Sequence, residues 1–131
     1  VWREWGLDII LKNAYESGTI MSGVSAGAIC WFEKGITDSW ANNLNVLECL
    51  GYTKGNCCPH YDEEPERKPS LSKFISNGEI SDCFAIDGGC ALHLKNDQVF
   101  KSISFKNGKN SFLVKNEEGR ITETSLPKIS L

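Results

Sequence analysis

Apolar positions have helical spacing in the first part of the chain and strand spacing in its last third. Residues 2–17 present one broad apolar face and are followed by Gly18, which predicts an amphipathic helix and its end. The short apolar segment 19–22 predicts a buried strand. Residues 26–33 predict a second helix, so that a strand, a tight turn and a helix follow one another.

The apolar periodicity weakens between residues 35 and 56. Asparagine, aspartate and glycine are frequent there and predict loops around the short apolar segment 44–50. Residues 57–61 have the pattern of a strand end that enters a loop. A proline then predicts the start of a short helix over 70–76, which an Asn-Gly pair ends.

The last third of the chain alternates short apolar segments with turn residues. Strands are predicted at 83–86, 91–94, 99–105, 111–114 and 121–124. The pairs Asn96-Asp97, Asn107-Gly108 and Glu118-Gly119 separate them and predict hairpin turns, because asparagine, aspartate and glycine tolerate positive φ. The order of the elements predicts an α/β core with an antiparallel edge, within one domain over residues 1–131.

Composition and charge narrow the class of protein. The formal net charge is −3 and the lysines are dispersed, which argues against a nucleic-acid partner. No apolar run approaches the ~20 residues that a membrane span needs, so we expect no membrane partner.

The chain holds six cysteines, most of them within apolar runs. It has no Cys-x-x-Cys pair, so we expect no structural zinc site. We expect the buried, reduced thiols of a cytoplasmic protein, with no metal and no cofactor. His60 follows Cys57 and Cys58 closely, but adjacent cysteines rarely point the same way, which argues against a soft-metal site there.

Residues 23–27 read Gly-Val-Ser-Ala-Gly, the pattern of a nucleophile elbow between a strand and a helix. Such a turn holds a serine hydroxyl outward, and a side chain at Gly23 or Gly27 is expected to collide with the neighbouring backbone. We therefore expect Ser25 to attack a carbonyl and the amide of Ala26 to stabilise the oxyanion. The competing interpretation is a glycine-rich structural turn with a bystander serine.

A serine nucleophile needs a base, and the base needs an orienting acid. Of the two histidines, His60 lies at a predicted strand end, where functional groups of α/β sheets gather, whereas His93 lies inside a predicted strand. Asp38, after the elbow helix, and Asp87, at the end of the strand 83–86, are both candidates for the acid. Chain order does not choose between them, because unrelated folds reach the same geometry in different orders.

Three segments, 23–32, 59–61 and 85–92, resemble in sequence and order the peptidase E family of serine peptidases, which includes aspartyl dipeptidases. The resemblance implies a class-I-glutaminase-like fold, with a doubly wound, mostly parallel sheet and antiparallel hairpins at its C-terminal end. It implies the hydrolysis of dipeptides or short peptides, typically after an N-terminal aspartate, without a metal. It puts the nucleophile on Ser25 and the general base on His60.

The same resemblance bears on the acid and on the substrate. The family's acid position after the elbow helix corresponds to Asp38, and a second family carboxylate before a glycine corresponds to Asp87; we favour Asp38 and leave the choice open. Family members bind the substrate aspartate with an arginine, for which Arg67 is the candidate. A guanidinium suits a carboxylate because it offers paired donors. The competing interpretation of Arg67 is a solvated loop residue.

The family's N-terminal strands and their Gly-Gly-Asn loop, which supplies the second oxyanion donor, are expected to be absent, so the chain is interpreted as a partial domain. Two alternatives to an active peptidase therefore stay open. One is an incomplete or inactive domain that needs a missing N-terminal segment or a homo-oligomer, since exposed sheet edges favour such partners. The other is an esterase-type acyl hydrolase built on the same elbow.

Overall fold

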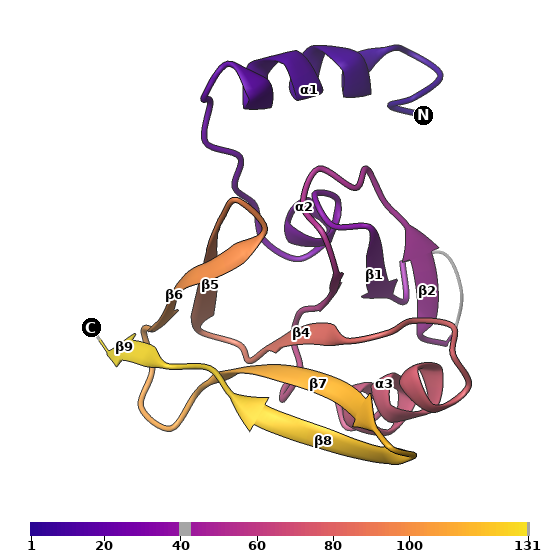
Figure 1. Ribbon diagram of the computed structural model, residues 1–131, viewed down its shortest axis with the longest axis vertical. Helices are drawn as coiled ribbons and strands as arrows, with labels where there is room; N and C mark the ends of the chain where they lie inside the picture. The colour runs from indigo at the N-terminus through magenta and orange to yellow at the C-terminus, as the bar shows by residue number, and fades with distance from the viewer. Residues whose placement is uncertain (40–42, 131) are drawn as a thin grey trace.

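A six-stranded sheet, covered on both faces, organises the fold (Figure 1). The computed structural model describes residues 1–39 and 43–130. Its elements are α1 (Leu7–Glu16), α2 (Ala26–Ile29), β1 (Lys34–Thr37), β2 (Asn45–Glu48), β3 (Asn56–Cys58), α3 (Arg67–Ser76), β4 (Cys83–Ile86), β5 (Cys90–Lys95), β6 (Gln98–Ser104), β7 (Ser111–Glu117), β8 (Arg120–Ser125) and β9 (Lys128–Ser130).

The strands of the main sheet follow the order β2-β1-β3-β4-β7-β8. The central strands β1, β3 and β4 are parallel to one another, whereas β2 pairs antiparallel with β1, β7 pairs antiparallel with β4, and β8 pairs antiparallel with β7. The predicted α/β class is confirmed, and the parallel part of the sheet consists of these three central strands. Because parallel strands end at the same edge, residues that follow β1, β3 and β4 gather there.

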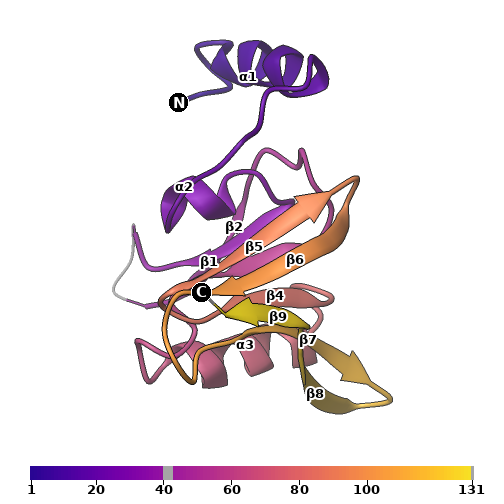
Figure 2. The same cartoon turned by 90° about the vertical axis from the view of Figure 1, so that its left-hand side faces the viewer.

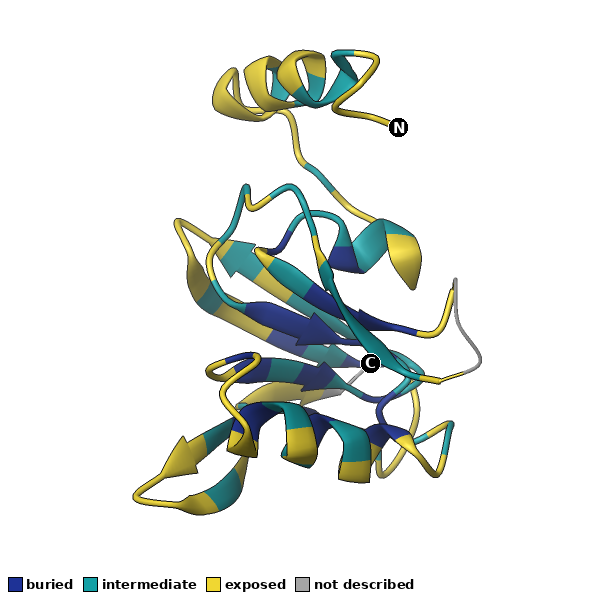
Figure 3. Cartoon of the chain, turned by 90° about the vertical axis from the view of Figure 1, so that its right-hand side faces the viewer, coloured by how far each residue is buried: buried dark blue, intermediate teal, exposed yellow. Residues whose placement is uncertain are grey.

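Side chains of the central strands alternate between two apolar layers. One layer lies under α3 and includes Cys58 and Cys83; the other lies under α2 and β5 and includes Cys57 and Phe84. Figure 3 shows the buried residues concentrated in these strands and along the inner side of α3. Adjacent Cys57 and Cys58 therefore face opposite layers, as expected for neighbours on a strand.

The loops predicted between residues 35 and 56 are partly wrong, because β1 and β2 lie in this region. The formation of these two short strands depends on tertiary contacts. A Cβ built on Gly35 would lie 2.5 Å from Cβ of Ile29, so α2 packs closely on the start of β1. Ile36 is fully buried in the layer under α3. The strand β1 therefore depends on close packing that its short sequence pattern does not display.

The strand predicted at 19–22 is wrong, and so are several helix ends. Residues 19–22 have no regular structure and Ile20 is 88% exposed, because no neighbouring strand among the described residues pairs with this segment. Helix α1 starts at Leu7 rather than Trp2, and α2 ends at Ile29. Helix α3 begins earlier than predicted, so its proline lies in the first turn, where a missing N–H costs little.

Helix α1 lies apart from the sheet and buries none of its residues (Figures 1 and 3). The helix and the residues before it contact the turn after β2: Tyr15 stacks on Tyr52 at 6.0 Å, and Arg3 donates to the carbonyl of Cys49 at 2.6 Å. Among the described residues, no helix combines the length and the apolar character that crossing a membrane requires.

Two of the three predicted hairpin turns are confirmed. Asn96 and Asp97 connect β5 to β6, and Glu118 and Gly119 connect β7 to β8, all four with positive φ. The hairpin predicted at 107–108 is wrong, because β6 and β7 belong to different sheets. Strands β5, β6 and β9 form a second, three-stranded sheet, visible beside the main sheet in Figure 2.

The layer under α3 yields a stability prediction. Leu71 is fully buried there, so Leu71→Ala should lower the free energy of unfolding by about 2–5 kcal/mol, through lost burial and a cavity. Ser76→Ala, on the exposed side of the same helix, should change it by less than about 0.5 kcal/mol. Urea denaturation of both variants measures the difference, and equal midpoints would contradict this account of the core.

Candidate active site

Four of the predicted site residues lie at one edge of the sheet. Asp38, His60 and Asp87 follow the parallel strands β1, β3 and β4. Ile29 at the end of α2 packs on Gly35 at the start of β1, so α2 runs back along that strand. Its other, exposed end, where Ser25 lies, is on the same side as the end of β1 (Figure 3).

Ser25 occupies a strained backbone conformation. Its φ is 55° and its ψ is −120°, a region that residues with a side chain rarely adopt. Its carbonyl accepts hydrogen bonds from the amides of Ala28 at 2.9 Å and Ile29 at 3.1 Å, which join the turn to α2. Such strain costs on the order of 1–3 kcal/mol and is concentrated at functional sites. The side chain of Ser25 is exposed on this turn.

The two glycines of the Gly-x-Ser-x-Gly pattern have different roles. A Cβ built on Gly23 would lie 1.9 Å from the carbonyl oxygen of Gly27, so Gly23 is sterically required, as predicted. A Cβ built on Gly27 would meet no heavy atom within 4 Å among the described residues. The collision predicted at Gly27 is therefore wrong for this part of the chain, because Gly27 lies on the open side of α2.

The amide of Ala26 is available at the first position of α2. No acceptor among the described residues receives its hydrogen bond, and the residue is exposed beside Ser25. The arrangement is the one expected of an oxyanion donor, which must be unoccupied and next to the nucleophile.

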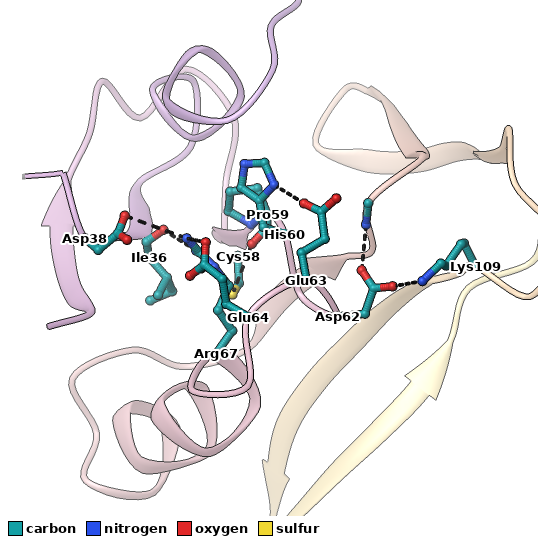
Figure 4. Close-up of polar contacts among 11 residues, drawn as sticks. Ile36, Asp38, Cys58, Pro59, His60, Asp62, Glu63, Glu64, Arg67 and Lys109 are labelled. Carbon is teal, nitrogen blue, oxygen red and sulfur yellow. Dashed lines mark hydrogen bonds and ion pairs between the residues drawn. The ribbon is translucent and has the colours of Figure 1, made fainter.

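His60 also has a left-handed backbone, with φ 56°, directly after Pro59 at the end of β3. Its Nδ1 contacts Oε2 of Glu63 (Figure 4). Because Nδ1 is engaged, Nε2 is the nitrogen left for proton transfer. His93 lies exposed on β5, edge-on to the ring of Phe100 at 5.0 Å, as expected of a strand residue.

Asp38 and Arg67 contact each other (Figure 4). The side chain of Arg67 is 4% exposed; its Nε and Nη2 donate to Glu64 at 2.9 and 3.2 Å, and its Nη1 donates to the carbonyl of Ile36 at 3.4 Å. A carboxylate oxygen of Asp38 lies 3.8 Å from Nη2. The interpretation of Arg67 as a solvated loop residue is wrong, because its charge is buried and paired. A substrate carboxylate would have to compete with Glu64 for the guanidinium.

Asp87 is buried beside the end of β3. One carboxylate oxygen accepts the amide of Asn110 at 3.0 Å, while Oδ1 has no hydrogen-bond partner among the described residues. Burial raises the pKa of Asp87, the hydrogen bond from Asn110 lowers it, and the charge of Asp62 raises it further. The register that pairs Cys58 with Ala85 places Asp87 near His60, but no hydrogen bond between their side chains is found in the described ranges.

Glu63, which contacts His60, is a residue that the sequence did not single out. The signal available was an acid three positions after the candidate base, inside a charged segment at 62–67. A charged loop usually indicates solvated side chains, so the signal did not distinguish Glu63 from its acidic neighbours.

The cysteines do not offer a competing nucleophile. All six are free thiols, and Cys57, Cys58 and Cys83 are buried. Burial raises the pKa of Cys58 to about 11, although the nearby charge of Arg67 acts in the opposite direction. Thiols kept protonated in this way are poor nucleophiles. Within residues 1–39 and 43–130, no group of three His, Cys, Asp or Glu side chains is arranged to hold a metal ion.

Comparison with known proteins decides the family. A model of the peptidase family S51 matches residues 1–102, which include the elbow, the His60 segment and β4. The chain belongs to this family. The family resemblance predicted from the three motifs is thereby confirmed. The chain is related to peptidases, which are hydrolases.

The S51 chain is also 46% identical over 127 residues to the "Uncharacterized peptidase YgaJ" of Bacillus subtilis (strain 168). The match covers 97% of the chain and 55% of that relative. The chain thus spans about half the length of the curated relative it matches.

Replacing the two glycines of the elbow by alanine should affect amide hydrogen exchange in α2 differently. Gly23→Ala forces the Gly27 carbonyl to move, so the amides of Ala28 and Ile29 should exchange with solvent faster. Gly27→Ala should leave this exchange unchanged or slow it, because alanine favours a helix over glycine by about 0.5–1 kcal/mol. Amide hydrogen exchange followed by NMR measures both, and equal protection in the two variants would disprove the steric role of Gly23.

Proposed function

We propose that the chain carries the nucleophile and base of a serine peptidase that hydrolyses dipeptides or short peptides through an acyl-enzyme on Ser25. The strained turn at Ser25 is the observation that carries the proposal. Position 23 requires a glycine for steric reasons, and the strained turn that follows presents Ser25 at the edge of the sheet where His60 lies. Membership of a peptidase family supports the peptide bond as the target.

In the proposed acylation step, Oγ of Ser25 attacks the carbonyl carbon while Nε2 of His60 takes the hydroxyl proton. The carbonyl electron pair moves to oxygen, where the amide of Ala26 donates a hydrogen bond. When the electron pair returns, the C–N bond breaks and His60 gives its proton to the leaving amine. The products are an ester on Ser25 and the free C-terminal part of the peptide.

In deacylation, water replaces the amine and His60 takes a proton from it. The hydroxide adds to the ester carbonyl, the C–O bond to Ser25 breaks, and His60 returns the proton to Oγ. The N-terminal product leaves as a carboxylic acid, and both residues recover their starting protonation. The proposed cycle uses water and groups of the chain itself, namely the side chains of Ser25 and His60 and the amide of Ala26.

Recognition of an N-terminal aspartate by Arg67 stays a prediction. The pairing of Arg67 with Glu64 means that a substrate carboxylate must displace a bonded protein carboxylate. The esterase-type alternative needs the same elbow and differs only in the leaving group, an alcohol in place of an amine.

A second candidate is a domain that works only with a further chain segment or a second copy of itself. The apolar side chains around α1 and the following turn favour it: Trp5, Ile9, Ile10, Ile20 and Val24 are between 63% and 88% exposed. Exposed apolar residues on one side of a chain indicate a covering partner. Light scattering decides between an oligomer and a monomer, and full activity of a monomeric chain would exclude this candidate.

Ser25→Ala should abolish peptide hydrolysis, with a fall in turnover of roughly 10⁶-fold as for the loss of a triad serine, because no other nucleophile replaces Oγ. Ser22→Ala, three positions away and also exposed, is the matched control and should keep full activity. Mass spectrometry after treatment with a fluorophosphonate should find the adduct on Ser25 alone. Undiminished activity in Ser25→Ala would rule out the proposed nucleophile.

The substrate class can be separated with matched acyl groups. Asp-X, Leu-X and Lys-X dipeptides should be compared with p-nitrophenyl esters. A peptidase should cleave at least one dipeptide series with a kcat/KM that falls when Ser25 is replaced. Turnover of esters without turnover of any dipeptide would support the acyl-hydrolase alternative instead.

A further inference from the structure

Three segments of the chain meet at the turn after β4. The amide of Tyr61, in the loop after β3, donates to the carbonyl of Ile86 at 3.0 Å, and the amide of Gly88 donates to Oδ1 of Asp62 at 2.8 Å. The other oxygen of Asp62 contacts the ammonium of Lys109, which lies in the loop between β6 and β7 (Figure 4). Asp62 therefore joins the turn to the loop after β3, and Lys109 holds Asp62 from a third segment.

The loop between β6 and β7 also contacts Asp87 directly. The amide of Asp87 donates to the carbonyl of Asn110 at 3.1 Å, and the amide of Asn110 donates to Oδ2 of Asp87 at 3.0 Å. Lys109 is the residue before Asn110 in the chain. One loop therefore fixes the Asp87 turn twice, by its backbone at Asn110 and through Asp62 at Lys109.

Of the two candidate acids, Asp87 has an oxygen without a partner. Asp38 lies 3.8 Å from Arg67. Asp87 is 7% exposed, and its Oδ1 has no hydrogen-bond partner among the described residues. Because an unpaired polar atom is costly to bury, the contacts around the turn must hold this carboxylate where a donor can reach it.

From this geometry we propose that Lys109 is a positioning residue for Asp87. By holding Asp62 on the amide of Gly88, it keeps the Asp87 turn attached to the loop that follows β3. The proposal rests on the proposed function, with His60 as the base and Asp87 as its acid. Lys109 acts on the reaction through Asp62 and the turn, and contributes no group to the reacting atoms.

The surroundings of the Asp62–Lys109 pair support this role. The side chains of Asp62 and Lys109 are 17% and 38% exposed, so the carboxylate is largely removed from water. Burial raises the pKa of Asp62, but the hydrogen bonds from Lys109 and from the amide of Gly88 outweigh it, and the pKa lies below its usual value. Asp62 is thus held as a charged acceptor for both groups.

The two members of the pair act on the charge of Asp87 in opposite directions. Burial raises the pKa of Asp87, the hydrogen bond from Asn110 lowers it, and the charge of Asp62 raises it. The charges of Lys68 on α3 and of Lys109 lower it. Loss of either member should loosen the turn, whereas the two losses should shift the pKa of Asp87 oppositely. Position and charge can therefore be separated.

The first test follows the turn by NMR in the purified chain. Lys109→Met and Asp62→Ala should both speed the exchange of the Gly88 amide with solvent several-fold, because Asp62 is released or removed. Titration of the Asp87 carboxyl carbon should find its pKa raised in Lys109→Met and lowered in Asp62→Ala. Unchanged Gly88 exchange in Lys109→Met would overturn the proposal, because the lysine would then not act through the turn.

The second test is a double-mutant cycle on peptide hydrolysis. Lys109→Met should lower kcat by up to roughly 10²-fold with little change in KM, as expected when a group is misplaced from outside the reacting centre. Asp62→Ala should lower kcat by a similar factor, and adding Lys109→Met to it should have no further effect, since both act through one contact. Full kcat in Asp62→Ala beside a loss in Lys109→Met would show that the lysine acts by its charge alone, and would refute the proposal.

Lys115→Met is the matched control. Lys115 also forms an ion pair, with Glu117 at 2.6 Å, and its side chain is 40% exposed. It follows Val114, which pairs with Cys83 at the other end of β4. Lys115→Met should therefore leave kcat unchanged, and a loss equal to that of Lys109→Met would contradict the proposal.

Lys109→Arg keeps a cationic donor for Asp62 and should retain most of the kcat, which makes the test independent of how well the methionine variant folds. A loss in Lys109→Arg as large as in Lys109→Met would count against the ion pair. A wild-type protein without peptide turnover would count against the peptidase function, and the Gly88 exchange and Asp87 titration would still decide the role of Lys109.

Discussion

The parallel pairing of β3 with β4 is the constraint on which the rest of the structure depends. Its register pairs Cys57 with Phe84 and Cys58 with Ala85, so that each strand contributes to both apolar layers. A shift by one residue would exchange the side chains between the layers. The same register places the residues that follow the two strands, His60 and Asp87, at one edge.

The polar edge combines local strain with rigid support. Ser25 and His60 both have positive φ, and each follows a residue that limits the chain: Ser25 comes two positions after the sterically required Gly23, and His60 follows Pro59. Strained residues persist only where the surroundings hold them. Here Ile29, at the end of α2, packs in one apolar layer with Phe32 and Cys57, which holds the helix that follows Ser25.

Three consecutive acidic residues of the loop from His60 to Arg67 each pair with a different basic side chain. Asp62 pairs with Lys109, Glu63 with His60, and Glu64 with the buried Arg67. The Glu64 pair neutralises a cation beneath the edge, while the Asp62 pair attaches the loop to the turn after β4. Consecutive acids that look equivalent in the sequence therefore have different partners in the fold.

Much of the local structure follows from the sequence alone. The steric requirement at Gly23, the buried strand β4 and the turns at 96–97 and 118–119 depend on neighbouring residues, and the sequence displays them directly. Local sequence patterns also selected Ser25 and His60 as a candidate pair, because a tight turn and a strand end are local features.

Only the tertiary structure decided the features that depend on distant partners. The strand β1 forms because Gly35 admits Ile29, and residues 19–22 form no strand because no neighbour pairs with them. The partners of His60 and Arg67 likewise depend on where a loop meets the rest of the fold. By itself the sequence determined which backbone conformations are sterically allowed and which positions favour burial. Tertiary packing determined which charges meet, because a charge pairs with whatever the fold brings within reach.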